Sequence, residues 1–243
     1  QNAPIWTGPL VIMQNELSAS ASEILAGAMK DYGRAVIVGS PNSFGKGTVQ
    51  TFVELNRFLN SNDDFGALKL TIQKFYRING KSTQLKGVEA DIPMKDVYGY
   101  EEIGERFDNF ALPWDQVNTT TFTALDNSKN TGLAKKSENR LAQNKNYQLL
   151  LESAQWREKL DKEEKISLNI KDFEALMKER KAQIEKFKPL LKYNNGLTFT
   201  LHPDEVTRGK KDEVFAKKSD NWIKNLKRDI YLQETVNIIS ELK

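Results

Sequence analysis

The chain of 243 residues contains no cysteine and a single histidine, His202. The lack of cysteine excludes a thiol nucleophile, a disulfide and a cysteine zinc site. The histidine lies in a turn-like stretch beside a proline, where we expect a surface or structural role. A Ser-His-Asp triad is therefore not expected within this chain, and any serine nucleophile needs a base of another residue type.

Long hydrophobic runs and a strong charge of one sign are also missing. No apolar run approaches the ~20 residues that a transmembrane helix needs, so we predict no integral membrane segment. Lys and Arg number 36 against 33 Asp and Glu, a formal net charge of +3. Local basic clusters occur around Lys186 and at residues 208–211, but no aromatic platform or known motif accompanies them. We therefore do not expect nucleic-acid binding.

The most informative stretch is residues 18–23, which read Ser-Ala-Ser-Ala-Ser-Glu. They follow the apolar run 10–13 and precede a helical pattern, which predicts a strand, a tight turn and a helix. A serine at a helix N-terminus lies beside backbone N–H groups that favour developing negative charge. The structural alternative is an N-cap, since Ser20 followed by Glu23 also fits a capping box.

Residues 36–50 combine an apolar strand with a Gly-Lys-Gly sequence, which invites comparison with a phosphate-binding loop. The match fails, because five residues separate Gly39 from Gly45 instead of four, and Gly47 follows Lys46 where the motif needs Ser or Thr. The residues that follow predict a strand, so no helix N-terminus is present to hold a phosphate. We do not expect a nucleotide or another cofactor.

The remaining interpretation of these two motifs is a serine nucleophile that is activated by a lysine. A serine hydroxyl needs a base to become a nucleophile, and lysine can be that base only as the neutral amine, which burial favours. Lys46 has apolar neighbours, and Gly45 and Gly47 allow other groups to approach the backbone closely. Gln50 can accept a hydrogen bond from the amine and orient it. In a straight strand Lys46 and Gln50 would lie roughly 13 Å apart, so the glycines must bend the segment if both act in one site.

These motifs resemble the carboxyl-terminal processing peptidases of family S41. The resemblance rests on residues 18–24, 31–35, 44–50, 71–80, 82–88, 111–115 and 231–238, and the last two stretches are typical of the tail-specific protease branch. It implies a serine-type C-terminal processing endopeptidase. By this resemblance Ser20 is the nucleophile, Lys46 the base and Gln50 the residue that orients the lysine. Ala21 would donate one N–H to the oxyanion hole, and the resemblance implies no metal and no cofactor.

Two departures accompany the resemblance. The loop 40–43 is one residue longer than the usual form, which can alter how Lys46 enters the site. The family's N-terminal helical region, its PDZ domain and the Gly-rich segment with the second oxyanion donor do not precede Gln1. We therefore interpret the chain as a C-terminal fragment of a longer protease, and we expect the fragment alone to be weakly active.

The composition changes near Trp114, from apolar runs and Gly-rich turns to charged helical patterns. We predict an α/β architecture: part of a crotonase-like catalytic core at 1–116, a linker at 117–130 and a mainly α-helical C-terminal domain at 131–243. Residues 67–78 predict one long strand that ends at an Asn-Gly turn. Residues 198–201 predict a short strand.

The function predicted from the resemblance is endoproteolysis, by a Ser/Lys dyad, of proteins with apolar C-terminal tails. The partners it implies are protein substrates and an envelope adaptor protein, and the location it implies is the periplasm or cell envelope of a Gram-negative bacterium. Two alternatives stay open. One is a non-catalytic interaction or scaffold module of a larger protease. The other is a crotonase-fold acyl-CoA enzyme, which shares the architecture but needs no Ser/Lys pair.

Overall fold

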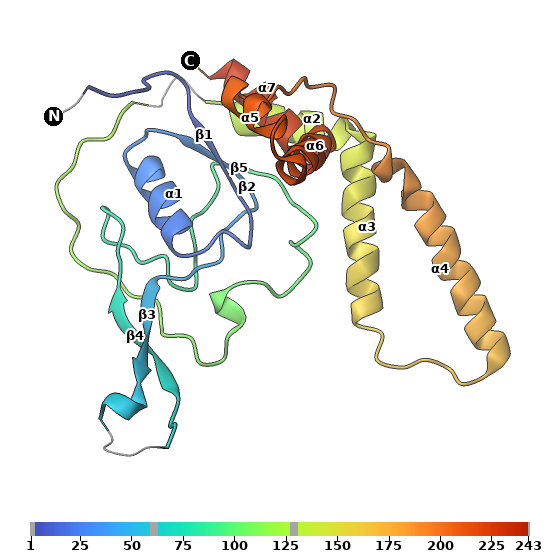
Figure 1. The fold of residues 1–243 in the computed structure, drawn as a ribbon, viewed down its shortest axis with the longest axis horizontal. Helices are drawn as coiled ribbons and strands as arrows, with labels where there is room; N and C mark the ends of the chain where they lie inside the picture. Colours follow the sequence, from blue (N-terminus) through green and yellow to red (C-terminus); the bar gives the residue numbers. More distant parts are fainter. Residues whose placement is uncertain (1–2, 59–62, 127–130, 243) are drawn as a thin grey trace. The chain divides into compact units, whose positions relative to one another are not determined.

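The computed structural model describes residues 3–58, 63–126 and 131–242. The chain divides into two compact units (Figure 1), one that ends at residue 131 and one that covers 132–242. We refer to them as the N-unit and the C-unit. The observed architecture is mixed α/β in the N-unit and helical in the C-unit.

The N-unit begins with a strand, a helix and a second strand. Strand β1 (Val11–Gln14) is followed by helix α1 (Ala21–Asp31) and strand β2 (Val36–Gly39). β1 and β2 are parallel, and the short strand β5 (Ile92–Pro93) pairs in parallel with the other side of β2. The strand, tight turn and helix predicted around residues 18–23 are therefore confirmed.

The core of the N-unit lies between the parallel sheet and helix α1. Ala26 on α1 packs against Ile37 of β2, together with Val88 and the partly buried Ile12. All four residues of β2 are buried, as expected for a parallel strand with both faces covered. This packing fixes the carboxyl ends of β1 and β2, which is where the turn with Ser20 and the loop before Lys46 begin.

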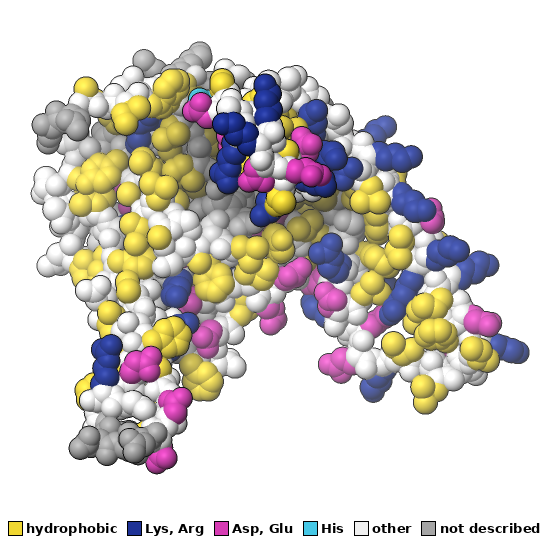
Figure 2. Space-filling view, viewed as in Figure 1, with side chains coloured by type: hydrophobic (Ala, Val, Ile, Leu, Met, Phe, Trp, Pro, Cys, Tyr) yellow, Lys and Arg dark blue, Asp and Glu magenta, His cyan; other side chains and the backbone are white. Residues whose placement is uncertain are grey.

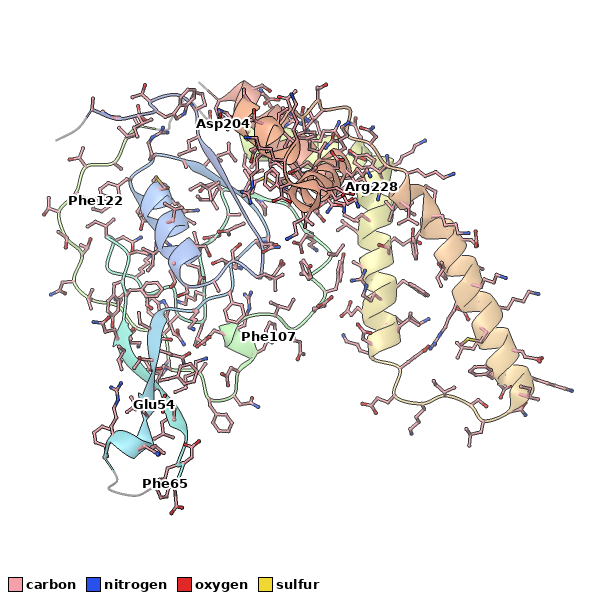
Figure 3. The ribbon with its side chains drawn as sticks, in the orientation of Figure 1. Glu54, Phe65, Phe107, Phe122, Asp204 and Arg228 are labelled. Carbon is pink, nitrogen blue, oxygen red and sulfur yellow. The ribbon has the colours of Figure 1, made fainter. Side chains whose placement is uncertain are left out.

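Strands β3 (Thr48–Glu54) and β4 (Ala67–Lys74) form an antiparallel hairpin that extends away from this core (Figure 1) and includes the short 3-10 helix η1 (Leu55–Arg57). Its apolar side chains remain exposed, among them Phe52 at 68% and Ile72 at 56%. Figure 2 shows hydrophobic side chains at the surface of this projection, and Figure 3 labels Glu54 and Phe65 on it.

The prediction of one strand over residues 67–78 is wrong at its end, because β4 ends at Lys74. Phe75 donates its N–H to the Gly47 carbonyl, and Tyr76 makes only an isolated bridge with Ser82. The chain therefore leaves the hairpin direction at this point. The predicted turn is present, since Gly80 has a φ of 81° and donates to the Arg77 carbonyl at 2.8 Å.

Residues 94–126 contain the short 3-10 helix η2 (Glu105–Phe107) and are otherwise irregular. The part of the predicted linker that the structure describes, residues 117–126, has no helix or strand and lies against the N-unit. The Leu125 N–H donates to the Tyr32 carbonyl at 2.9 Å, and the Phe122 ring meets the Tyr32 ring edge to face. Residues 127–130 of that predicted linker lie outside the described residues.

The C-unit contains helices α2 to α7. Their bounds are α2 Leu133–Gln143, α3 Lys145–Asp161, α4 Ile170–Leu191, α5 Pro203–Gly209, α6 Glu213–Lys227 and α7 Ile230–Glu241. The short strand predicted at 198–201 is wrong: these residues are irregular, since the helices beside them offer no strand edge for pairing. In the described part of the chain, no helix is both long and apolar enough to cross a membrane.

The C-unit is held together by helix-to-helix contacts. Ile238 of α7 is fully buried, and the rings of Tyr147 on α3 and Tyr231 on α7 meet edge to face. Arg140 of α2 donates to both carboxylate oxygens of Glu234, whose own side chain is buried. Helices α2, α3 and α7 therefore form one packed group.

Candidate active site

Ser20 occupies the turn between β1 and α1. Its backbone φ is 58° and its ψ is −114°, a positive φ that residues other than glycine rarely adopt. A conformation of this kind costs of order 1–3 kcal/mol and persists only where the surrounding structure holds it. Ser20 is half-buried, and Ala21, the first residue of α1, is exposed at a helix start, where backbone N–H groups have no intrahelical acceptor. The predicted capping box is present, with Ser20 as the N-cap of α1 and Glu23 as its third residue. The turn thus places the Ser20 hydroxyl at a capped helix N-terminus.

The buried carboxylate of Glu23 joins this turn to the loop that carries Lys46. Its Oε2 accepts the backbone N–H of Ser20 at 2.8 Å and that of Lys46 at 2.9 Å. Its Oε1 accepts the Ser43 hydroxyl at 2.5 Å and the Gly45 N–H at 2.7 Å. One carboxylate oxygen therefore holds the backbones of both predicted dyad residues, which lie 26 positions apart in the sequence.

Burial raises the pKa of Glu23, and the four hydrogen bonds that it accepts act in the opposite direction. The side chain has no exposed surface. From the sequence, Glu23 is interpreted only as a capping residue. Its position three residues after Ser20 gives the cap, but its contacts with residues 43–46 depend on the fold and carry no local signal.

The glycines on both sides of Lys46 are needed for close backbone approach, as the sequence predicts. Gly45 has a φ of 93°, and its carbonyl accepts the Leu85 N–H at 2.8 Å. A Cβ on Gly47 would lie 2.6 Å from the backbone nitrogen of Gln84, which is closer than real Cβ contacts. Lys46 itself is half-buried.

Gln84, like Glu23, makes contacts with the loop of Lys46 that the sequence analysis does not predict. Its side chain has no exposed surface, and its Oε1 accepts the Gly47 N–H at 2.9 Å. Its Nε2 donates to Glu105 Oε1 at 3.1 Å and to the Leu112 carbonyl at 3.0 Å. Gln84 therefore connects the loop of Lys46 to two later segments of the chain. A glutamine between Thr83 and Leu85 gives no local signal for this role.

Gln50 lies on β3 and its side chain is exposed. The ladder between β3 and β4 shifts register between Val49 and Gln50, which is a β-bulge. The sequence requires a bend between Lys46 and Gln50 only if both act in one site. An irregularity is present, and it lies beside Gln50 as well as at the glycines. Within residues 3–58 and 63–126, no hydrogen bond joins the side chains of Ser20, Lys46 and Gln50 to one another.

Residues 114–115 contact the end of β4 and the segment that follows it. The Trp114 indole N–H donates to the Ser82 carbonyl at 2.9 Å. Asp115 pairs with Lys74 at 2.9 Å and accepts the Tyr76 hydroxyl at 3.1 Å. The hydrogen bond from Lys74 lowers the pKa of Asp115. These contacts hold residues 74–76 beside the segment that supports the loop of Lys46.

Two buried acids, Glu16 and Asp96, lie beyond the carboxyl ends of the parallel strands. The Ser40 hydroxyl donates to Glu16 Oε2, and Asp96 Oδ1 accepts the Tyr98 N–H at 2.8 Å. Burial and the charge of Glu16 raise the pKa of Asp96 to about 6. Two negative charges so close together are unfavourable, and the raised pKa means that Asp96 keeps its proton to a higher pH than an ordinary aspartate.

His202 is exposed and belongs to the C-unit, as the N-cap of α5, where its Nδ1 accepts the Asp204 N–H at 3.3 Å. The predicted structural role of His202 is confirmed. Within the described ranges, no three side chains of Asp, Glu or His form a group that could hold a metal ion.

Family models match both parts of the chain. Residues 1–94 match peptidase family S41, and residues 98–243 match the C-terminal domain of tail-specific protease. The chain therefore belongs to the S41 peptidases, and within them to the tail-specific proteases.

Individual relatives agree with this assignment. The tail-specific protease of Haemophilus influenzae is 47% identical over 123 residues, which cover 50% of this chain and 18% of that protein. The carboxy-terminal-processing protease of Bartonella bacilliformis is 43% identical over 98 residues, or 38% of this chain and 21% of that protein. This chain thus spans about a fifth of the length of these relatives.

Among solved structures, the photosystem II D1 C-terminal processing protease shares 36% sequence identity. The match covers 36% of this chain and 20% of that chain, with a TM-score of 0.31. A score this low supports no argument about the fold.

Proposed function

We propose that this chain supplies the nucleophile and the base of a serine endopeptidase that acts on the C-terminal tails of proteins. Ser20 is the nucleophile, Lys46 is the base, Gln50 orients the lysine amine, and the Ala21 N–H stabilises the oxyanion. A crotonase-like core for the catalytic part and the domain bounds 1–116, 117–130 and 131–243 belong to the same proposal.

The proposed reaction has two halves. The Ser20 Oγ attacks the peptide carbonyl, and the neutral amine of Lys46 takes the hydroxyl proton and delivers it to the leaving amine as the C–N bond breaks. Water then attacks the acyl-serine ester. Lys46 takes a proton from that water and returns it to Ser20 Oγ, which restores the enzyme and releases the new carboxylate.

The observation that carries the proposal is the shared contact of Glu23. Because Glu23 Oε2 accepts the N–H groups of both Ser20 and Lys46, the two backbones are held within reach of one atom. The strained φ of Ser20 supports the same proposal, since strain of this kind concentrates at active sites. Direct contact between the two side chains is not required before substrate binds, because catalytic hydrogen bonds are often long in free enzymes.

The test uses the complete protein and a substrate with an apolar C-terminal tail. Ser20→Ala and Lys46→Ala are each expected to abolish cleavage while the circular dichroism spectrum and the melting temperature are retained. Ser22→Ala is the matched control for the serine, because the exposed Ser22 hydroxyl bonds only to the Ala19 carbonyl. Full cleavage by Lys46→Ala would rule out the lysine as base.

Two other functions remain as competitors. One is a non-catalytic interaction or scaffold module of a larger protease, and the chain spans about a fifth of the relatives' length. We expect the 243-residue chain alone to cleave tailed peptides very poorly, because loss of even one oxyanion donor typically costs about 10²–10³ in rate. Robust Ser20-dependent turnover by this chain would contradict that expectation.

Mass spectrometry distinguishes the proposed protease from the second competitor, an acyl-CoA enzyme of crotonase fold. The protease predicts a covalent acyl group on Ser20 during turnover of a peptide ester, whereas the acyl-CoA enzyme predicts none. The apolar character of the tails, an adaptor partner and a location in the periplasm or cell envelope rest on the family resemblance alone, and we include them in the proposal on that basis.

A further inference from the structure

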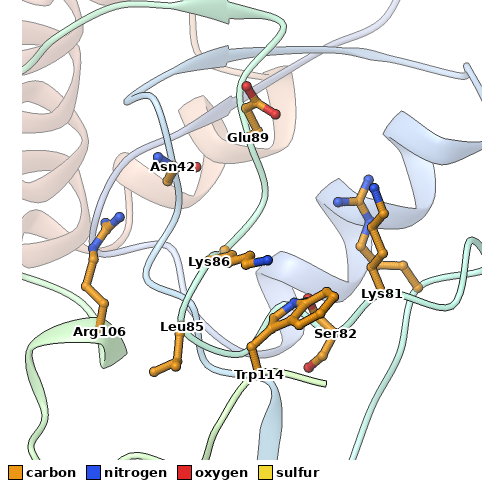
Figure 4. Close-up of a pocket in the computed structure, with 10 residues that line it drawn as sticks. Asn42, Lys81, Ser82, Leu85, Lys86, Glu89, Arg106 and Trp114 are labelled. Carbon is orange, nitrogen blue, oxygen red and sulfur yellow. The ribbon is translucent and has the colours of Figure 1, made fainter. Parts of the chain in front are cut away.

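A basic pocket lies in the N-unit, apart from the Ser20 turn. It has a volume of about 510 Å³, and its lining includes Arg77, Lys81, Lys86, Glu89, Arg106 and Trp114 (Figure 4). Four of these six side chains are cationic and one is acidic. The whole chain carries a net charge of only +3, so the charge of this pocket is a local feature and does not follow from a basic composition.

In the described part of the chain, three of the four cations have no acidic partner. Arg77 is paired with Asp31, the last residue of α1. Within the described residues, no carboxylate forms an ion pair with Lys81, Lys86 or Arg106. Like charges collected in one cavity repel one another and raise the local concentration of anions. A bound anionic group would relieve this repulsion.

Lys86 and Trp114 give the pocket a defined interior. The Lys86 ammonium lies 3.6 Å from the centroid of the Trp114 ring, and Figure 4 shows Lys86 extended across the pocket toward Trp114 and Lys81. The indole is fixed in turn by its bond to the Ser82 carbonyl. The cation is therefore held in place over an aromatic face, as a preorganised contact for a ligand.

We propose that the basic pocket binds an acidic peptide segment, whose carboxylates pair with Lys81, Lys86 and Arg106 and whose apolar side chains contact Trp114 and Leu85. The volume lies in the usual range of ligand pockets, roughly 300–1,000 Å³, and it far exceeds what one small anion fills. The cations come from separate segments on both sides of Lys86 (Figure 4). This spread matches a ligand with several carboxylates and apolar residues between them.

The segment behind the pocket is the one that supports the loop of Lys46. Leu85, which has a positive φ of 64°, donates to the Gly45 carbonyl, and the adjacent Gln84 accepts the Gly47 N–H. Leu85 lines the pocket, so a peptide bound there contacts a residue that bonds directly to the proposed catalytic loop. Binding itself does not require Ser20 or Lys46, so the proposal stands or fails independently of the proposed catalysis.

The experiment is calorimetric titration of the 243-residue chain with a peptide of alternating glutamate and leucine, blocked at both ends. Binding is expected, and Lys86→Gln and Arg106→Gln should each weaken it about tenfold, as expected for loss of a charged hydrogen bond. Lys69→Gln is the matched control, because Lys69 is exposed on β4 outside the pocket. Melting temperatures verify that the variants remain folded.

Two further probes decide the ligand class. The same peptide with glutamine in place of glutamate should not bind, and inorganic phosphate should bind much more weakly than the acidic peptide. No binding of the acidic peptide, or equal binding by all variants, would overturn the proposal. Phosphate binding as tight as peptide binding, with the same loss in Lys86→Gln and Arg106→Gln, would also overturn it and would assign the pocket to small anions.

Discussion

At the scale of single residues, two positions of the proposed active site are energetically unfavourable: the backbone of Ser20 and the buried carboxylate of Glu23. Ser20 has a backbone conformation that glycine tolerates better than serine. Glu23 keeps a carboxylate fully out of water, and its burial raises its pKa. A helix cap explains the bond of Glu23 to the Ser20 N–H, but it requires neither the positive φ of Ser20 nor the full burial of Glu23. A site that depends on fixed geometry explains both.

Replacement of Ser20 separates stability from activity. Ser20→Gly is expected to be about 1 kcal/mol more stable than Ser20→Ala, because glycine relieves the strain of the positive φ while alanine retains it. Both variants lack the hydroxyl and should be inactive. Urea unfolding of the two variants measures the difference. Equal stabilities would mean that the backbone at Ser20 relaxes without cost.

Asp96 predicts a pH dependence of stability. Its pKa is about 6 in the folded chain, against an ordinary value of 3.8, so the folded state holds the proton more tightly than the unfolded state. Stability from this group is therefore present below about pH 4 and is lost as the pH rises to about 6. The loss can reach about 3 kcal/mol, since one pKa unit corresponds to about 1.4 kcal/mol.

Asp96→Asn should remove this slope and stabilise the chain above about pH 6, because the amide oxygen can still accept the Tyr98 N–H. Urea unfolding between pH 4 and pH 8 measures the effect. Asp108→Asn, at an exposed position, is the control and should leave the slope in place. A slope that survives in Asp96→Asn would assign the titration to another group.

At the scale of elements, the loop that carries Lys46 is held by close backbone contacts, and a side chain at Gly47 would prevent one of them. Gly47→Ala is expected to destabilise the chain by about 1–3 kcal/mol through overpacking, because its Cβ would lie 2.6 Å from the Gln84 nitrogen. Cleavage by the complete protein should also fall. Gly209→Ala in α5 is the control, since its Cβ would meet nothing closer than 3.6 Å. Comparable losses in both variants would contradict the close approach at Gly47.

The same elements show how far sequence patterns reach. The strand, turn and helix around Ser20 follow from local periodicity, and they could be predicted. The end of β4 was not predicted: the alternation breaks at the adjacent aromatics Phe75 and Tyr76, but only the fold shows that these two residues turn to Gly47 and Ser82 as partners. The roles of Glu23 and Gln84 were missed for the same reason: each depends on contacts more than 20 residues away in the sequence.

At the scale of the whole molecule, the two units are expected to respond separately to mutation. Arg140→Met removes the partner of Glu234, whose side chain is only 5% exposed. An uncompensated buried charge typically costs about 3–5 kcal/mol, reduced here because Arg140 is itself about one-third exposed. Hydrogen exchange should therefore speed up across residues 132–242.

The control for this prediction lies in the same experiment. Amides of the described N-unit, such as those of β2, should keep their protection in Arg140→Met, because β2 belongs to the other compact unit and the ion pairs of Arg140 lie within the C-unit. Lys135→Met, at an exposed ion pair on the same helix, should have little effect on either unit. Faster exchange in β2 would mean that the units unfold together.

The connection through Gln84 also sets an order of events during synthesis. Gln84 follows Gly47 by 37 residues, and Leu112 follows Gln84 by another 28. A ribosome adds roughly 5–20 residues per second. The loop of Lys46 is therefore synthesised seconds before Gln84 and Leu112, whose contacts hold it in place. A nascent chain that has reached only the hairpin carries the proposed nucleophile and base without the contacts that fix them. Assembly of the site is thereby delayed until most of the N-unit has been translated.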